Sequence, residues 1–263
     1  MVKIGIIGGT GVYDPNLIED AKKIKVHTPY GKPSDFITTG VYKGKEVAVI
    51  PRHAAGHRIN PSDVNYRANI WALKDLGVTH ILTSSAVGSL KKEYAPGHLA
   101  FADQFIDRTY RRKTTFYEGD TVCHVSTAEP VCPALRNLFI KAAKKLNYDH
   151  HERATCVVVE GPRFSTKAES KMYQQWGGDI IGMTMHPEAT LAREAEICYA
   201  TVAMVTDYDC WYDEHVDAEA VMKTMKANVS KVKDIFSQVI PEINDKIKTD
   251  NCGCNEALKF ALM

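Results

Sequence analysis

The stretch that decides the fold is residues 60–89, NPSDVNYRANIWALKDLGVTHILTSSAVGS. Tyr66, Ile70 and Leu73 recur at helical spacing, which predicts an α-helix with one apolar face. Asn60 and the proline after it supply an N-cap and a first helical position before that face begins. An apolar run follows the helix and ends in small hydroxyl side chains, which predicts a buried strand and a polar loop. A helix that leads into a buried strand is typical of α/β proteins.

The same alternation continues in both directions along the chain. The expected strands are Val2–Ile7, Phe36–Val41, Glu46–Ile50, Val78–Thr83, Thr155–Val159, Ile180–Met183 and Cys198–Val205. The other expected helices are Pro133–Leu146, Lys167–Trp176, a helix from Pro187 through Glu196, and a mostly helical stretch at about 218–247. We therefore expect an α/β fold of one domain, residues 1–263, with a mixed central β-sheet flanked by helices and a short tail from about residue 249.

The charge balance and the N-terminus exclude several classes of protein. The chain has 263 residues, with 33 Lys and Arg against 32 Asp and Glu, a formal net charge of +1. Nucleic-acid-binding proteins usually carry a strong basic excess, so no nucleic-acid partner is expected. No apolar run approaches the length of a membrane span, and the apolar start of the chain is too short for a signal peptide. We expect a cytoplasmic protein with no membrane contact.

Seven cysteines are scattered along the chain, apart from the pair in Cys252-Gly-Cys254. An odd, scattered count does not resemble a small secreted disulfide framework. The pair also lacks the two-residue spacer of zinc and thioredoxin-type motifs. Two interpretations stay open: buried thiols that pack as small apolar groups, or structural disulfides of the kind found in heat-adapted intracellular proteins. As a hypothesis, a disulfide in the tail would raise kinetic stability.

Several strand ends carry groups that suit an anion. Gly8–Gly11 follows the first strand, and its backbone N–H groups and the Thr10 hydroxyl could cradle a phosphate. The third glycine of the dinucleotide fingerprint is missing, which disfavours an NAD-dependent dehydrogenase. Arg52-His53 follows another strand, and an arginine fork matches two phosphate oxygens. The hydroxyls of Thr83–Ser89 and of Thr184 end two more strands, so we expect one convergent phosphate pocket.

Metal binding near Arg52 is not expected. His53 and His57 are four residues apart, which would suit a metal if they lay on a helix. Pro51 and Gly56 instead predict a loop, and the glutamate of the HExxH motif is missing.

Two carboxylates follow the last expected strand. If that strand continues, the side chains of Asp207 and Asp209 point to the same face. Two carboxylates close together do not both ionise easily, so the pKa of one of them rises. The protonated one could act as a general acid; a divalent metal site and simple solvated acids are the alternatives. Phe164, in a loop after another strand, could stack on a flat ligand. The chain contains no G-x-S-x-G nucleophile motif.

Four long motifs contain most of these residues: GIIGGTGVYD at 5–14, PRHAAGHRINPSDVNYRANIWALKDLGVTHIL at 51–82, VVEGPRFSTKAES at 158–170 and MVTDYDCW at 204–211. They closely resemble the 5′-methylthioadenosine phosphorylases, in the trimeric branch of the purine nucleoside phosphorylase family. The resemblance runs from about Lys3 to Pro241 and leaves out the cysteine tail. It implies a small-molecule nucleoside and phosphate as substrates, no cofactor, no metal at the site, and a homotrimer or a dimer of trimers.

The resemblance also implies a role for each candidate residue. Those that would hold phosphate are Thr10, Arg52, His53, Ser85, Ala86 and Thr184, with Ser85 standing where threonine is expected. Those that would contact the nucleoside are Met183 at the ribose, Phe164 at the purine, Val221 at the 5′ substituent, and the catalytic pair Asp207 and Asp209 at the base edge. Ser165 and Ala218 would tune specificity, and His124 would reach the neighbouring subunit's site.

The implied reaction is phosphorolysis of 5′-methylthioadenosine to adenine and 5-methylthioribose 1-phosphate, with adenosine also accepted, in purine and methionine salvage. Phosphate would attack C1′ with inversion while a protonated Asp207 donates to purine N7. A carboxylate acceptor also disfavours 6-oxopurines, whose oxygen it would face. An inosine or guanosine phosphorylase and a non-catalytic purine sensor are the rival interpretations; phosphate-dependent base release would separate an enzyme from a sensor.

Overall fold

The sheet is organised around the long strand β5 (His80–Ser89) in a computed structural model that describes residues 3–8, 18–212, 218–244 and 252–263. β5 pairs in parallel with β1 (Lys3–Gly8) on one side and with β11 (Cys198–Asp207) on the other. Where β1 ends, β10 (Ile180–Gly182) takes its place and pairs antiparallel with the last residues of β5. β5 therefore touches both halves of the sheet, and its end lies where they meet.

The remaining strands extend the sheet on both sides and make it mixed, as predicted. They are β2 (Glu19–Ile24), β3 (Ile37–Tyr42), β4 (Lys45–Pro51), β6 (Leu99–Ala100), β7 (Gln104–Arg108), β8 (His150–His151) and β9 (Thr155–Val159). The main order is β2-β3-β4-β1-β5-β10-β9-β7, while β6 pairs with β11 and β8 pairs with β6. The β1–β4, β5–β11 and β9–β10 pairs are parallel, whereas β3–β4 and β5–β10 are antiparallel.

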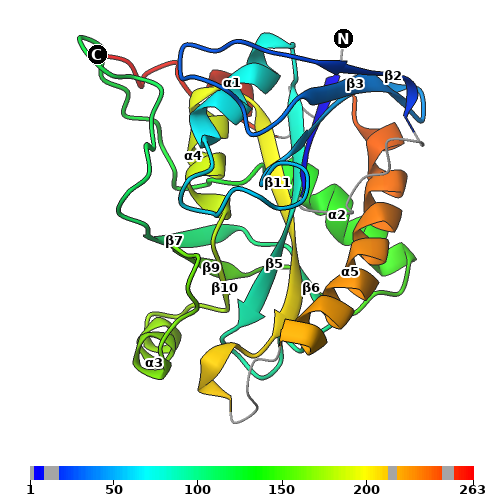
Figure 1. The fold of residues 1–263 in the computed structure, drawn as a ribbon, viewed down its shortest axis with the longest axis vertical. Coiled ribbons are helices and arrows are strands. Elements are labelled where there is room, and N and C mark those ends of the chain that lie inside the picture. Colours follow the sequence, from blue (N-terminus) through cyan, green and yellow to red (C-terminus); the bar gives the residue numbers. More distant parts are fainter. Residues whose placement is uncertain (1–2, 9–17, 213–217, 245–251) are drawn as a thin grey trace.

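Helices cover both sides of β5 and β11 (Figure 1). α1 (Tyr66–Asp75) and α4 (Met185–Glu194) pack together on one side, and α2 (Pro133–Lys145) and α5 (Ala218–Val239) pack together on the other. Strands covered on both faces bury nearly every residue, and β11 is buried from Cys198 to Thr206. α3 (Lys167–Gln175) lies apart, against the short 3₁₀ helix Asp209–Trp211. Among the described helices, none is long and apolar enough to cross a bilayer.

Two local expectations were wrong. The N-cap of α1 is Asn65, whose side-chain oxygen accepts from Ala68 N at 3.1 Å, and not Asn60. Asn60 instead closes a turn, because its carbonyl accepts from Asp63 N at 3.1 Å. The hydroxyl segment 83–89 is also strand and not loop, because β11 supplies ladder partners along all but the last of its residues.

The tail disulfide is likewise not present. The seven cysteines all lie among the described residues, and no S–S bond joins any of them. The Sγ atoms of Cys198 and Cys252 are 3.5 Å apart, whereas a disulfide requires about 2.05 Å.

Candidate active site

One cavity of about 330 Å³ opens at the carboxyl ends of β4, β5, β10 and β11. Ligand cavities in open α/β sheets form at this edge, and this volume suits a small ligand. Ten of the candidate residues line it: Arg52, His53, Ser85, Ala86, Phe164, Ser165, Met183, Thr184, Asp207 and Asp209. The topology thus brings together strand ends that lie far apart in the sequence.

The other four candidates are not placed in this cavity. Thr10 lies outside the described residues, and so do the side chains of Ala218 and Val221 in the first turn of α5. His124 is exposed and its backbone N–H donates to the Ala261 carbonyl at 2.8 Å. Its expected reach into a neighbouring subunit stays a prediction.

Arg52 lies at one end of the cavity, 2% exposed, and its charge is compensated. Its Nε and Nη2 donate to the two carboxylate oxygens of Glu188 at 2.5 and 3.0 Å, and its Nη1 donates to the Ser84 carbonyl at 2.9 Å. The guanidinium has five N–H groups, so one on each terminal nitrogen has no partner in the described part of the chain and can serve a ligand. The expected fork is therefore occupied by Glu188, and the pair as a whole is neutral.

His53 follows Arg52 and is neutral at neutral pH. Burial, together with the Arg52 charge, lowers its pKa to about 4. Its Nδ1 lies 2.9 Å from the Ile59 carbonyl, which can only accept, so Nδ1 carries the hydrogen. In the neutral ring Nε2 is then an acceptor, which suits the hydroxyl of a hydrogen phosphate ion.

Three buried hydroxyls on the cavity wall have no hydrogen-bond partner among the residues that the structure describes. Ser84 Oγ, Ser165 Oγ and Thr184 Oγ1 have no hydrogen bond within the described part of the chain. A buried hydroxyl without a partner costs about 1–3 kcal/mol, so such groups in a cavity point to a polar ligand. Ser84 lies at the Arg52 end, because its carbonyl accepts from Arg52. Thr184 is the N-cap of α4, the helix that carries the Arg52 partner Glu188, so it lies at the same end.

Asp207 and Asp209 lie at the other end, because both contact Gly88, four residues further along β5 than Ser84. Burial raises the pKa of both carboxyls. The Asp207 oxygens accept from Thr206 Oγ1 at 2.7 Å and from the Asp209 backbone N–H at 3.0 Å. These bonds favour the ionised form and partly oppose the effect of burial. An acid held this way can keep its proton for a leaving group.

The two carboxylates reach the cavity by a turn and not by strand alternation. β11 ends at Asp207 with a register shift opposite Gly88, and Asp209 opens the 3₁₀ helix with φ of +48°. Both aspartates press against Gly88, where an added Cβ would lie 3.2 Å from Asp207 Oδ2 and 3.3 Å from Asp209 Cβ. The expected common face is therefore reached by a different backbone path.

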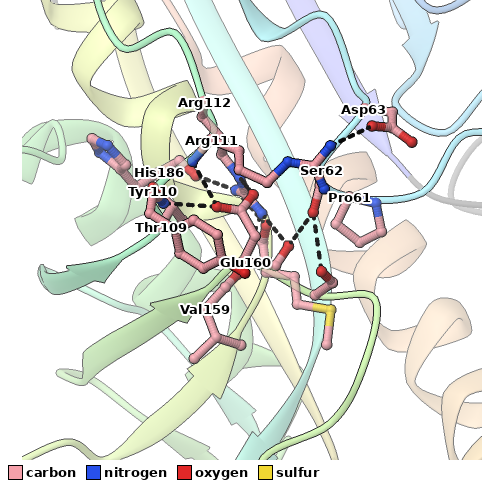
Figure 2. Close-up of polar contacts among 12 residues, drawn as sticks. Pro61, Ser62, Asp63, Thr109, Tyr110, Arg111, Arg112, Val159, Glu160 and His186 are labelled. Atoms are coloured by element: carbon pink, nitrogen blue, oxygen red, sulfur yellow. Dashed lines mark hydrogen bonds and ion pairs between the residues drawn. The ribbon is translucent and has the colours of Figure 1, made fainter.

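A buried ion pair joins Arg112 and Glu160 next to Met183, which lines the cavity (Figure 2). Arg112 Nε donates to Glu160 Oε1 at 3.1 Å, and Nη1 donates to the carbonyls of Met183 and His186 at 2.7 and 2.6 Å. Glu160 Oε2 accepts two further bonds, from the backbone N–H groups of Tyr110 and Arg111. Burial raises the pKa of Glu160, but these bonds outweigh it and leave the pKa below its usual value. Arg112 thus acts as a positioning residue for Met183.

The position of Met183 also depends on a glycine, which leaves room for its side chain. A Cβ at Gly161, where φ is +67°, would lie 2.5 Å from Met183 Sδ, so any side chain there would displace the thioether. The Ser62 hydroxyl fixes the same turn, because its one hydrogen is shared between the carbonyls of Glu160 and Gly161, at Oγ–O distances of 2.8 and 3.1 Å (Figure 2). Beyond this turn Phe164 is 66% exposed at the cavity, free to cover a flat ligand.

Sequence reasoning missed Glu188, Arg112 and Glu160, and it included Ser84 only as a member of the hydroxyl run 83–89. Glu188 is fully buried, and a charged residue on a helix next to apolar ones gives no sign of its partner 136 residues away. For Ser84, the hydroxyl run was the signal, and the structure identifies it as the member of that run whose carbonyl accepts from Arg52.

The chain belongs to the phosphorylase superfamily, whose family model matches residues 3–241. Among its relatives is the S-methyl-5′-thioadenosine phosphorylase of Thermofilum pendens, 51% identical over 262 residues, covering 100% of this chain and 99% of that protein. The enzyme of the same name from Saccharolobus solfataricus is 51% identical over 261 residues, covering 99% and 97%.

Solved structures of methylthioadenosine phosphorylases share the fold. One, from an antarctic soil metagenomic library, has a TM-score of 0.94 at 43% identity and covers 100% of this chain and 92% of its own. Another, from Schistosoma mansoni in complex with adenine, has a TM-score of 0.91 at 40% identity and covers 98% and 96%.

Proposed function

We propose that this protein cleaves 5′-methylthioadenosine with inorganic phosphate, giving adenine and 5-methylthioribose 1-phosphate, and that it also accepts adenosine. The observation that carries the proposal is one cavity with an anion end at Arg52, His53 and Thr184 and an acid end at Asp207 and Asp209. The names of the relatives support the same substrate.

The geometry supports a definite order of events. Phosphate at the Arg52 end attacks C1′ as the bond from C1′ to the purine nitrogen breaks, and the bonding electrons go to the base. The base accepts a proton on N7 from Asp207, whose burial favours the protonated form. The other carboxylate accepts from the 6-amino group. No cofactor is needed, because phosphate is the second substrate.

Base release measured with and without phosphate tests the proposal. We expect phosphate-dependent adenine release from 5′-methylthioadenosine and adenosine, and no base release from inosine or guanosine. Release from inosine or guanosine would overturn the base-recognition argument and favour the 6-oxopurine alternative. No release from any of the four would leave a binding protein as the better interpretation.

We further propose that the protein acts in the cytoplasm as a homotrimer or a dimer of trimers. The exposed His124 and Phe164 support an arrangement in which a neighbouring subunit completes the site. Sedimentation velocity should give a trimer or hexamer, and a monomer with full activity would overturn this part of the proposal.

A further inference from the structure

Four thiols from distant parts of the chain meet at one point. Cys132 is the N-cap of α2, Cys198 is the first residue of β11, and Cys252 and Cys254 belong to the C-terminal segment. Their four Sγ atoms all lie within 4.8 Å of one another. None of them lines the active-site cavity, so the cluster needs an explanation of its own.

The spacing of the sulfurs fits a single tetrahedral centre. Zinc–sulfur bonds of about 2.3 Å place the sulfurs of a tetrahedral site about 3.8 Å apart. The Cys198–Cys252 distance of 3.5 Å and the common limit of 4.8 Å bracket that value. Two disulfides would instead place the sulfur atoms of two cysteine pairs about 2.05 Å apart.

The backbone around the cluster holds its ligands in place. The backbone N–H of Cys132 donates to the Tyr199 carbonyl at 2.8 Å, and that of Cys198 donates to the Thr79 carbonyl at 3.1 Å, so both are anchored to the sheet. Cys132, Cys198 and Cys254 are at most 3% exposed, which shields the sulfurs from water. The Leu135 N–H, in the first turn of α2, lies 3.5 Å from Cys132 Sγ and can stabilise a bound thiolate.

We propose that Cys132, Cys198, Cys252 and Cys254 bind one thiophilic divalent cation, namely zinc, in a structural site. Four sulfurs without an oxygen ligand select zinc over magnesium or calcium, and four protein ligands leave no open position for catalysis. Each thiol gives up its proton to solvent as its sulfur binds the ion. The spacing of Cys252 and Cys254 argues against a local zinc motif, but the fold supplies the other two ligands from elsewhere.

The ion would fasten the C-terminal segment to the sheet. Beyond the cluster, Val122 N–H donates to the Met263 carbonyl at 3.2 Å and His124 N–H to the Ala261 carbonyl at 2.8 Å. The tail therefore holds the exposed segment that carries His124. Zinc in the cluster would stabilise that segment without touching the active-site cavity.

Metal analysis of the whole protein is the primary test. The protein is produced in zinc-supplemented medium, purified without chelators and gel-filtered, and its metal is measured by mass spectrometry together with its reactive thiols under denaturing conditions. We expect about one zinc per chain and, after exchange to cobalt, the intense visible absorption of a tetrahedral thiolate site. Absence of zinc together with four unreactive cysteines would identify disulfides and overturn the proposal. So would seven reactive thiols in a reduced protein that takes up neither ion.

A matched pair of variants ties the ion to the cluster. Cys252→Ser changes the half-buried ligand, and Cys123→Ser changes a half-buried cysteine that pairs with the tail at Leu262 outside the cluster. We expect Cys252→Ser to lose most of its zinc and to unfold at a lower temperature, while Cys123→Ser keeps both values. Equal zinc in the two variants would overturn the assignment. Because the readouts are metal content and unfolding temperature, this result does not depend on the proposed activity.

Discussion

At the Arg52 end of the cavity, the buried positive charge of Arg52 is compensated by Glu188. At the Asp207 end, the two buried carboxyl groups have no ion pair among the described residues. The first end must bind its ligand by directed hydrogen bonds from a neutral pair, a neutral histidine and unpartnered hydroxyls. The second end holds two acids whose pKa values are raised by burial, which favours the protonated form. The comparison teaches that the site keeps a compensated cation apart from two carboxyls without a counter-charge, which under the proposed function separates the group that receives the phosphate from the group that protonates the leaving base.

The largest effect is expected at the acid end. Asp207→Asn removes the proton donor, so activity on 5′-methylthioadenosine should fall about 10²- to 10⁴-fold in kcat/KM. Activity on inosine or guanosine should appear, because an amide can donate to a 6-oxo group. Steady-state kinetics on all four nucleosides measures both changes. Asp63→Asn, at a 56%-exposed carboxylate, serves as the control. Full activity of Asp207→Asn on methylthioadenosine would show that the acid end does not act as assigned.

The second prediction concerns the neutrality of the anion end. Glu188→Gln leaves Arg52 as a buried cation without a counter-charge, which should cost about 3–5 kcal/mol in the free energy of unfolding. Urea unfolding measures it, with Glu169→Gln as a matched control. Glu169 pairs with Arg163, which is 68% exposed, and such a surface pair contributes little to stability. Equal losses in the two variants would mean that Glu188 does not compensate Arg52.

The elements with clear patterns were predictable from the sequence. β9 matches its expected bounds, and α2 and α3 differ from theirs by one residue, because their apolar periodicity and flanking turns are clear. β2 was missed because its sequence, EDAKKI, lies at the sheet edge and is almost wholly exposed, so no alternation marks it. β6 and β8 have two residues each, which is too short for a sequence pattern, and only their pairing with neighbouring strands defines them.

For the site, the sequence located strand ends but not the partners that modify them. Arg52 and Asp207 follow apolar runs, so their positions at strand ends could be predicted from the sequence. The Arg52–Glu188 and Arg112–Glu160 pairs join residues 136 and 48 positions apart, and only the folded chain brings them together. The four-cysteine cluster is of the same kind, since local spacing describes only one of its pairs.

A pH titration of stability sharpens the description of the anion end. The pKa of His53 is about 4 in the folded protein and 6.5 in the unfolded chain, so between these values the unfolded chain binds more protons. Stability from this group is therefore present above pH 6.5 and is lost as the pH falls toward 4. From pH 7 to pH 5 it should decrease by about 2 kcal/mol. His53→Gln should remove that decrease in urea unfolding, whereas His27→Gln, at an exposed position, should retain it. An unchanged pH dependence in His53→Gln would mean that His53 is not held neutral.

The smallest expected effect separates ligand binding from folding at the anion end. Thr184→Val keeps the shape of the side chain and removes the hydroxyl, which has no partner among the described residues. If that hydroxyl donates to phosphate, the loss of one hydrogen bond of about 0.5–1.5 kcal/mol should raise the KM for phosphate about 2- to 10-fold. The KM for the nucleoside should change little, and the free energy of unfolding should not fall, because no bond within the protein is lost. Thr184→Ser, which keeps the hydroxyl, should behave as the parent protein. A loss of stability without a change in the KM for phosphate would instead make Thr184 a structural residue, and the anion end would then depend on the remaining N–H groups of Arg52, on His53 and on Ser84.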